Sequence, residues 1–453
     1  MNFNLLRDKY QEFHYYGMDI QESDSELTVT YSFEIINLEK FNPSYTFAKK
    51  DIKMMSSYKI IKELLFNLGM IEMISYWKAT CSPKVYIHGY SLDENKKNWW
   101  KKLYYHGLGE FLYINNIKID VDNLMDIISL GDDLDGDELI QSYSGNIIPV
   151  GGGKDSFVSL EILKDFKDQN HTLVINKVMS AIHAVEAAGY AQRHIQVTRR
   201  LDLKIVELNK KGFLNGHTPF SAMVAFVSVI SAVLWQKKYV CLSNESSANE
   251  STINGMDVNH QYSKSVEFEK DFNNYINTYI FEDVKYFSLL RGLSELQIAS
   301  IFATLKNYHQ VFKSCNIGSK KEEWCNNCPK CLFVYIMLAA FLNDEELYNI
   351  FNSNLLDNEN LIDTMKQLCG ESTDKPFECV GTREEVQVAI YMAIKKRKET
   401  DSHLPLILEK ALTWKIFKSD IDVNKYRDEF NDDNLIEKNY IDLLKKKVLQ
   451  CWK

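Results

Sequence analysis

The stretch that decides the fold is "NIIPVGGGKDSFVSLEILKD", which runs from Asn146 to Asp165. An apolar run typical of a strand meets three glycines, then Lys-Asp-Ser, then a helical pattern. Ser156 occupies the place of the second glycine that both the Walker and the dinucleotide fingerprints require, so neither fits. The remaining pattern of strand, glycine loop and helix still predicts an anion site. Glycines let the backbone approach an anion, and the N–H groups at a helix start point toward it.

Each side chain of this loop has an expected task. Lys154 offers charge, and Ser156 can cap a helix that starts there while donating to a phosphate oxygen. Asp155 would repel phosphate unless it holds Mg²⁺ or a water. A plain turn is the alternative, but three consecutive glycines lose much backbone entropy on folding. The expected nucleotide-binding residues of the loop are Gly151, Gly152, Gly153, Lys154, Asp155 and Ser156.

Strand and helix patterns alternate through residues 141–345. We expect strands at 146–150, 172–178, 204–209 and 238–245, and helices from 156, near 181–194 and over 219–235. This alternation predicts an α/β domain with a central parallel sheet covered on both faces. Ligands of such sheets sit at the carboxyl ends of the strands. Beside the glycine loop, those ends carry Asn176, Asn209 and Ser243–Glu245.

The length of 453 residues predicts two or three domains. Residues 1–140 read as an α+β domain, with a strand at 27–36 and a helix at 60–77. Residues 346–453 read as a helical, charged region. The acidic stretch 130–138 is expected to be a surface connection.

Charge and hydropathy limit the partners. A net charge of −9 argues against general binding to nucleic acid or to a membrane surface, which needs a basic face. The N-terminus has no signal-peptide layout. The uncharged run 218–236 contains Pro219 and three serines, so it is expected to be a buried helix and not a membrane span. We expect a cytoplasmic protein, whose oligomeric state the sequence leaves open.

Four of the nine cysteines crowd into 315–331. The spacing Cys315-x9-Cys325-x2-Cys328-x2-Cys331 fits a tetrahedral, structural Zn²⁺ site with four thiolate ligands. Reduced, unligated cysteines are the alternative.

Three further segments carry polar groups that can bind or transfer protons. His217 precedes the helix expected over 219–235, with Thr218 as its cap. The segment 241–269 follows a strand and is expected to bind ligand, with Lys264 neutralising phosphate. "KPFECVG", residues 375–381, places Glu378 beside Cys379. Packed loops and a structural histidine are the alternatives. Asn244 and His260 also belong to the segment 241–269.

The glycine loop resembles the Ser-Gly-Gly-x-Asp-Ser loop of the N-type ATP pyrophosphatases, or PP-loop enzymes, with Gly151 in place of the first serine. The cysteine cluster is similar to the zinc knuckle of the 7-cyano-7-deazaguanine synthases. Together, "PVGGGKDS", "SNESSANE", "VNHQYSKSVEFE", "WCNNCPKCLFVYIMLAAFL" and "KPFECVG" resemble the UDP-N-acetylmuramoyl-L-alanyl-L-glutamate epimerases. That resemblance spans roughly residues 70–385.

The resemblance implies an isomerase with the adenine nucleotide α-hydrolase-like fold, acting in peptidoglycan precursor synthesis. The enzyme would adenylate the terminal L-glutamate of a UDP-muramoyl dipeptide with ATP and Mg²⁺, invert it to D-glutamate, and release AMP and diphosphate. The alternatives are another adenylating enzyme, which forms amides or nitriles or modifies tRNA, and a nucleotide-binding protein without turnover. One-base and two-base inversion both remain open. The expected catalytic residues are Asp155, Cys379, Glu378, His217 and His260.

Overall fold

One mixed sheet of eleven strands runs through the molecule. The computed structural model describes residues 2–49, 52–249, 262–315, 317–318, 321–373, 376, 378 and 380–452. The strand order is β11-β10-β7-β8-β9-β4-β2-β1-β5-β6, and β3 pairs with β2. The strands are β1 Glu12–Glu22, β2 Glu26–Ile35, β3 Glu39–Phe41, β4 Ser44–Ala48, β5 Lys84–Ile87, β6 Asp126–Ser129, β7 Asn146–Pro149, β8 Asn170–Ile175, β9 His194–Arg200, β10 Tyr239–Leu242 and β11 Lys285–Ser288.

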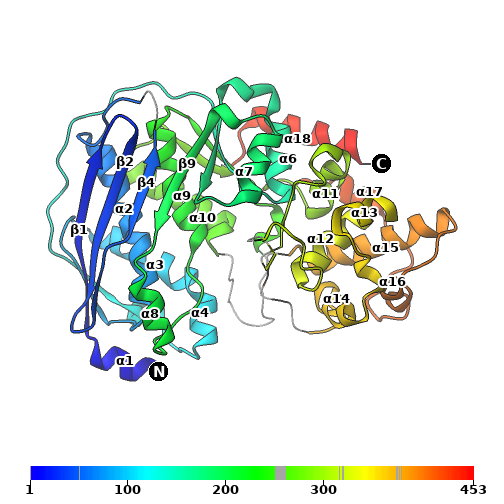
Figure 1. Cartoon of the computed structure of the whole chain (residues 1–453), viewed down its shortest axis with the longest axis horizontal. Helices are drawn as coiled ribbons and strands as arrows, with labels where there is room; N and C mark the ends of the chain where they lie inside the picture. The colour runs from blue at the N-terminus through cyan, green and yellow to red at the C-terminus, as the bar shows by residue number, and fades with distance from the viewer. Residues whose placement is uncertain are drawn as a thin grey trace.

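Helices pack on both faces of the parallel half of the sheet and form most of the C-terminal part of the chain (Figure 1). Those in the first half are α1 Phe3–Lys9, α2 Lys59–Trp77, α3 Glu94–Gly107, α4 Gly109–Ile114, α5 Val121–Leu124, α6 Lys154–Ile162, α7 Met179–Ala187, α8 Lys204–Lys210 and α9 Phe220–Leu234. They are followed by α10 Val266–Tyr279, α11 Glu295–Thr304, α12 Pro329–Ala339, α13 Asp344–Phe351, α14 Ile362–Cys369, α15 Arg383–Glu399, α16 Leu406–Ala411, α17 Val423–Asp428 and α18 Lys438–Cys451.

The parallel half of the sheet has the doubly wound order. Strands β9, β8 and β7 lie side by side in reverse chain order, and β10 and β11 then continue on the other side of β7. The direction of winding therefore reverses between β7 and β10. Loops that leave the carboxyl ends of strands on either side of such a switch point diverge and leave a crevice, where ligands bind. The glycine loop follows β7 and Ser243–Glu245 follows β10, so both segments border this crevice.

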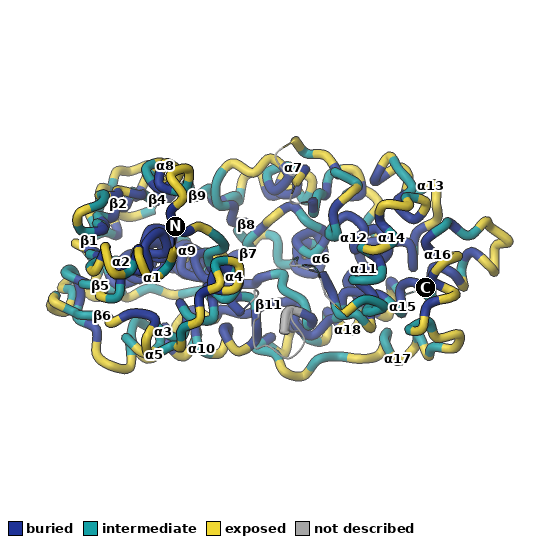
Figure 2. Tube along the Cα trace, turned by 90° about the horizontal axis from the view of Figure 1, so that it is seen from below, coloured by how far each residue is buried: buried dark blue, intermediate teal, exposed yellow. Residues whose placement is uncertain are grey.

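Successive side chains of the parallel strands point to opposite faces of the sheet and pack in two separate hydrophobic cores. Ile147 of β7 and Leu173 of β8 pack on one face, in the core that contains α2 and α9. Ile148 and Val174, their neighbours in sequence, point to the opposite core, which contains α6, α7, α11 and α12. Figure 2 shows the buried residues on both sides of the sheet. Burial on both faces explains why these strands are continuously apolar.

The N-terminal strands continue the same sheet. Strand β2 buries every second residue, and β4 joins it to β9 through an antiparallel pairing in which Phe47 lies opposite Val197. The buried carboxylate of Glu72 on α2 also binds the guanidinium of Arg199 on β9, with the Nε–Oε2 atoms 2.9 Å apart. The division of the chain near residues 140 and 345 stays a prediction, while the sheet itself runs across residue 140.

Two predicted elements are wrong. Residues 204–209 form part of helix α8 instead of a strand, and the third strand of the parallel half is β9. Ile205 and Leu208 are the buried residues of α8, and their spacing of three places them on one face of the helix. An apolar run this short is compatible with either a helix or a strand. Asn209 accordingly lies on a helix and not at a strand end, and the helix expected near 181–194 stops at Ala187.

Other predictions hold. The strand expected at 27–36 is β2, the helix at 60–77 is α2, and the apolar run after 218 is α9. Ala222, Phe226 and Val229 of α9 are fully buried within the core, as expected of a core helix. Among the described residues, no helix combines the length and apolar character needed to cross a bilayer. Residues beyond 346 are mainly helical, and α18 returns to pack beside α6 and α11.

Candidate functional site

The glycine loop turns the chain from β7 into α6. Gly152 has a φ of 83°, which favours glycine, and Gly153 is the N-cap of α6. The helix therefore begins at Lys154, two residues earlier than expected, and Ser156 does not cap it. Instead, Ser156 Oγ accepts a hydrogen bond from the Gly151 amide at 3.1 Å and so closes the loop on itself. The N-terminus of α6 then faces the crevice at the switch point, where it favours an anion.

A cavity of about 530 Å³ occupies this crevice. Its wall is formed by the glycine loop, by Ser243–Glu245 after β10, by the start of α9 and by the segment that leads into the cysteine cluster. Asn244 and Lys264, both expected from the sequence to bind ligand, also line it. The structure thus brings most of the predicted nucleotide-binding residues to one cavity.

Two carboxylates bind the ammonium group of Lys154, and a third lies close to both of them. Lys154 is buried, and its Nζ lies 2.5 Å from Asp155 Oδ1 and also binds Glu295 Oε2. One carboxylate oxygen from each of Asp155, Glu245 and Glu295 lies within 4.8 Å of the others. Carboxylate oxygens are ligands that Mg²⁺ prefers, so this grouping is compatible with the expected role of Asp155 as a magnesium ligand, which stays a prediction.

The pKa values of the two glutamates in this cluster are shifted in opposite directions. The pKa of Glu295 is raised to about 8, mainly by burial; the charge of Lys154 opposes this rise and that of Asp155 adds to it. Burial also raises the pKa of Glu245, but the ammonium groups of Lys264, Lys330 and Lys154 outweigh it, so that this pKa lies below its ordinary value. Lysine ammonium groups therefore lie close enough to Glu245 to stabilise its ionised form.

The sequence analysis missed several of these groups. Glu295 begins α11 after β11, a short strand that was not predicted, although "SELQ" at 294–297 is a recognisable capping box. Lys330, between Cys328 and Cys331, was not among the expected binding residues, yet it lines the cavity. Lys313 lines it as well, and its amide donates to the carbonyl of Gly152 at 2.9 Å.

A smaller apolar cavity of about 270 Å³ adjoins the first. The two share part of their lining, including Pro149, Phe220 and Val224. The remaining wall comes from the end of β8, where Asn176 adopts a φ of 61° and its Oδ1 accepts from the Arg199 amide at 2.8 Å. A polar cavity that opens into a small apolar one suits a molecule with a charged part and a flat apolar part.

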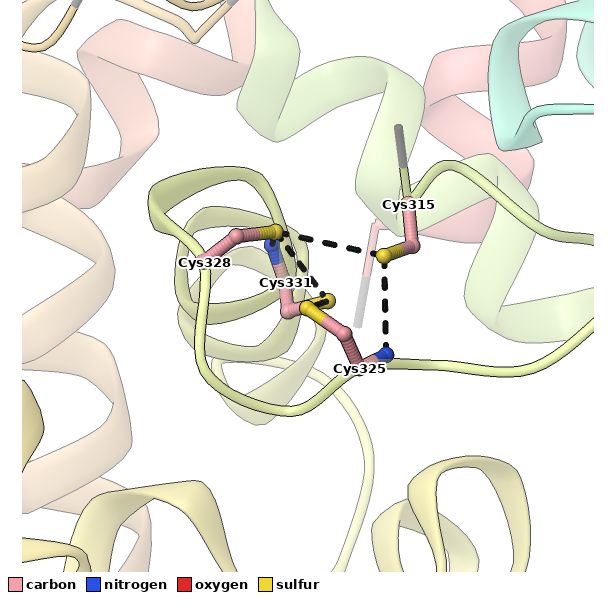
Figure 3. Close-up of side chains that lie close together, drawn as sticks. All are labelled: Cys315, Cys325, Cys328 and Cys331. Atoms are coloured by element: carbon pink, nitrogen blue, oxygen red, sulfur yellow. Dashed lines mark hydrogen bonds between the residues drawn. The ribbon is translucent and has the colours of Figure 1, made fainter. Parts of the chain in front are cut away.

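The predicted cysteine cluster is assembled in space (Figure 3). The sulfur atoms of Cys325 and Cys331 lie 3.7 Å apart, those of Cys328 and Cys331 3.5 Å apart, and those of Cys315 and Cys328 4.0 Å apart. A tetrahedral zinc ion with bonds of about 2.3 Å would separate its sulfur ligands by about 3.8 Å. The four thiols therefore fit a zinc ion without rearrangement.

Backbone geometry holds the thiols in place. Cys328 is the N-cap of α12, followed by Pro329 in the first turn, and its Sγ accepts from the Cys331 amide. The Gly318 amide donates to Cys315 Sγ at 3.1 Å. Hydrogen bonding from Cys331 lowers the pKa of Cys328 to about 5. N–H groups aimed at sulfur stabilise the thiolate form, which is the form that binds metal.

Of the four residues predicted to transfer protons, the structure describes two, and neither lines the cavity. Cys379 and His260 lie outside the described residues. His217 is near Glu110, with Nδ1 and Oε2 3.8 Å apart, and Glu378 donates its amide to Pro376 O. Neither His217 nor Glu378 is among the residues that line the cavity, so their roles stay predictions. Thr218 does not cap α9, because Pro219 occupies the N-cap position and no side chain caps that helix.

A larger cavity of about 760 Å³ lies on the N-terminal strands, between β1 and β2 and the loops beside them. Lys62 is the one lysine in its described lining, and that lining includes no helix N-terminus of the α6 kind. We place the functional site at the switch point, where cations, carboxylates and a glycine loop meet.

Comparisons with known proteins identify the family of the chain. The MurL N-terminal domain family matches residues 4–289, and the MurL C-terminal domain family matches residues 311–416. The UDP-N-acetyl-alpha-D-muramoyl-L-alanyl-L-glutamate epimerase of Xanthomonas oryzae pv. oryzae is 34% identical over 338 residues, 73% of this chain and 74% of its own. The protein of the same name from a Micromonospora species is 35% identical over 74% of this chain and 75% of its own. That from Salinispora tropica is 34% identical over 71% of each chain.

Proposed function

The chain belongs to the MurL epimerase family, and on this premise we propose that it inverts the terminal L-glutamate of UDP-N-acetyl-alpha-D-muramoyl-L-alanyl-L-glutamate at the expense of ATP. The enzyme is an isomerase that acts on a peptidoglycan precursor. AMP and diphosphate are the proposed by-products, as in adenylating enzymes with a related glycine loop.

The observation that carries the ATP requirement is the cavity at the switch point. It combines a glycine loop, a helix N-terminus and the cations Lys264 and Lys330, which together suit a chain of phosphates. The adjoining apolar cavity has the size and lining for a flat base. We assign the phosphates of ATP to the first cavity and its adenine to the second.

Adenylation makes the inversion chemically feasible. The α-proton of a free glutamate is hard to remove, because the resulting carbanion would lie beside a carboxylate. In the proposed first step, a carboxylate oxygen attacks the α-phosphorus of ATP and diphosphate leaves. The mixed anhydride has no negative charge on its carbonyl, so electron density from the broken C–H bond can move onto the carbonyl oxygen. Return of a proton to the opposite face inverts the centre, and hydrolysis then gives D-glutamate and AMP.

The residues of the cavity have corresponding roles. The loop amides, Lys264 and Lys330 would position the phosphates, while Lys154 holds Asp155 and Glu295 in place. Such positioning accounts for most catalysis of phosphoryl and nucleotidyl transfer. Asp155, Glu245 and Glu295 would hold Mg²⁺, which offsets negative charge where the α–β bridge breaks. The four-cysteine cluster would hold a structural zinc ion. Cys379, Glu378, His217 and His260 remain the candidates for the proton-transfer groups, with one-base and two-base inversion both open.

A direct test measures AMP and diphosphate release with purified protein and the UDP-muramoyl-L-alanyl-L-glutamate substrate, followed by acid hydrolysis of the product and chiral analysis of its glutamate. The matched control is the precursor without glutamate, which ends in L-alanine and lacks the residue that the reaction inverts. We expect substrate-dependent AMP, D-glutamate in the product, and deuterium at its α-carbon when the reaction runs in heavy water. Absence of substrate-dependent AMP would contradict the ATP requirement, and retention of L-glutamate would contradict epimerisation.

A further inference from the structure

Arg291 is a fully buried arginine in the turn that follows β11. Its Nη1 donates to the backbone carbonyl of Glu245 at 2.6 Å, and its Nη2 donates to the backbone carbonyl of Lys264. The side chains of Glu245 and Lys264 both line the cavity, as does that of Asn244, the neighbour of Glu245. One guanidinium group therefore joins two chain positions that are far apart in sequence.

The positive charge of Arg291 is compensated locally. Glu269 on α10 is buried as well, and its Oε1 lies 2.7 Å from Arg291 Nη2. Ser288 connects this pair to the cavity, because its hydroxyl donates to Glu269 and accepts from Asn244 Nδ2 at 2.9 Å. Arg291, Glu269 and Ser288 thus form one hydrogen-bonded network behind the cavity wall.

The shape of the guanidinium group explains why arginine occupies this position. Its rigid planar fork presents several N–H donors in fixed directions, so it can bind two carbonyls and a carboxylate at once. A lysine ammonium is a single point at the end of a flexible stem. It can pair with Glu269, but it cannot hold both carbonyls with the same geometry.

We propose that Arg291 is a positioning residue that holds the backbone at Glu245 and at Lys264, and thereby sets the affinity of the cavity for ATP. This inference rests on the proposed function, since it assigns the carboxylate of Glu245 and the ammonium of Lys264 to the nucleotide site. Arg291 itself lies behind the wall and is not among the residues that line the cavity.

The decisive variant is Arg291→Lys, assayed at saturating dipeptide substrate with ATP varied. We expect the KM for ATP to rise at least tenfold, because the charge that pairs with Glu269 remains while the bridge between the carbonyls is lost. A purely structural role would lower the amount of active enzyme, and hence the apparent kcat, and would leave the KM of the folded molecules unchanged. The split between KM and kcat therefore separates the two roles.

The double variant Glu269→Gln/Arg291→Met is the second test, since it removes both buried charges together and leaves neither unpaired. It should fold, as judged by circular dichroism and thermal unfolding, and show a similar rise in KM. The matched control is Arg397→Lys, a buried arginine on α15 that binds Asp344, where we expect no change in the KM for ATP.

The inference is overturned if the folded Arg291 variants keep a KM for ATP within twofold of wild type, or if neither variant folds, which would assign Arg291 a structural role. Wild-type protein without ATP dependence would instead refute the proposed function, so the two failures are distinguishable.

Discussion

The hydroxyl of Ser314 lies directly against Gly153, so that a methyl group built on Gly153 would meet Ser314 Oγ at 2.9 Å. Gly153 caps α6, and Ser314 immediately precedes the first cysteine of the four-thiol cluster. The cysteine cluster and the glycine loop are therefore in contact, and a change in one is expected to displace the other.

Gly153→Ala tests this contact. The new methyl group should push the loop away from Ser314 and raise the KM for ATP by roughly tenfold, because small displacements of positioning groups have large kinetic effects. Ser314→Ala removes the opposing hydroxyl, and the next nearest atom, Ser314 Cβ, would then be at 3.9 Å. The double variant should recover most of the affinity. Equal defects in the single Gly153→Ala and the double variant would show that the contact is not the cause.

Substitutions at the other two loop glycines, Gly151 and Gly152, should differ in their effect on the stability of the protein. A Cβ on Gly151 would meet no atom within 4 Å, so Gly151→Ser, which restores the first serine of the resembling loop, should leave the melting temperature unchanged. Gly152 has a φ of 83° and a Cβ there would approach the backbone of Ser180 at 2.7 Å. Gly152→Ala should cost about 1–3 kcal/mol of stability through strain. Thermal unfolding of the two variants side by side checks both expectations.

Local patterns account for what the sequence could predict. The strand, glycine loop and helix from Asn146 onward form one uninterrupted signal, and the cysteine spacing is nearly a ligand set by itself. Residues 204–209 were misread because six residues are too few to separate a helical from a strand period. Glu295 and Arg291 were missed because their importance depends on β11, which brings them to the cavity from a distant part of the chain.

Asp155→Asn is expected to reduce turnover by about two to three orders of magnitude, the usual effect of losing one electrostatic group in an active site. The fold should persist, because Lys154 keeps its buried partner Glu295. Asp165→Asn is the matched control, since Asp165 is an exposed carboxylate just after α6. The measurement is AMP release at saturating ATP and magnesium, together with circular dichroism. Turnover of the Asp155 variant near that of the control would remove Asp155 from the proposed mechanism.

Metal analysis of freshly purified protein should find about one zinc ion per chain, the stoichiometry of a closed four-thiolate site. Cys328→Ser should lose that metal and unfold at lower temperature. Cys369→Ser is the matched control, because Cys369 is buried but lies outside the cluster, and it should keep the zinc. Since the cluster contacts the glycine loop, the Cys328 variant should also bind ATP more weakly in equilibrium titration. Metal-free protein with wild-type stability would contradict a structural zinc site.

His171 on β8 is expected to make the protein less stable in mild acid. Its Nδ1 is buried and has no hydrogen-bond partner in the described chain. Burial, with smaller effects of Lys237 and Arg193, lowers its pKa to about 4. Above the unfolded-state pKa of about 6.5, both states are neutral and the stability is complete. As the pH falls from there toward 4, only the unfolded chain takes up the proton, so the free energy of unfolding decreases. Because the ring is partly exposed, we expect the loss to be roughly 1–2 kcal/mol.

Urea unfolding at pH 7.5 and pH 5 should show that His171→Gln flattens this dependence of stability on pH, whereas His403→Gln, at an exposed position, does not. Parallel slopes for wild type and the His171 variant would assign the acid sensitivity to other groups.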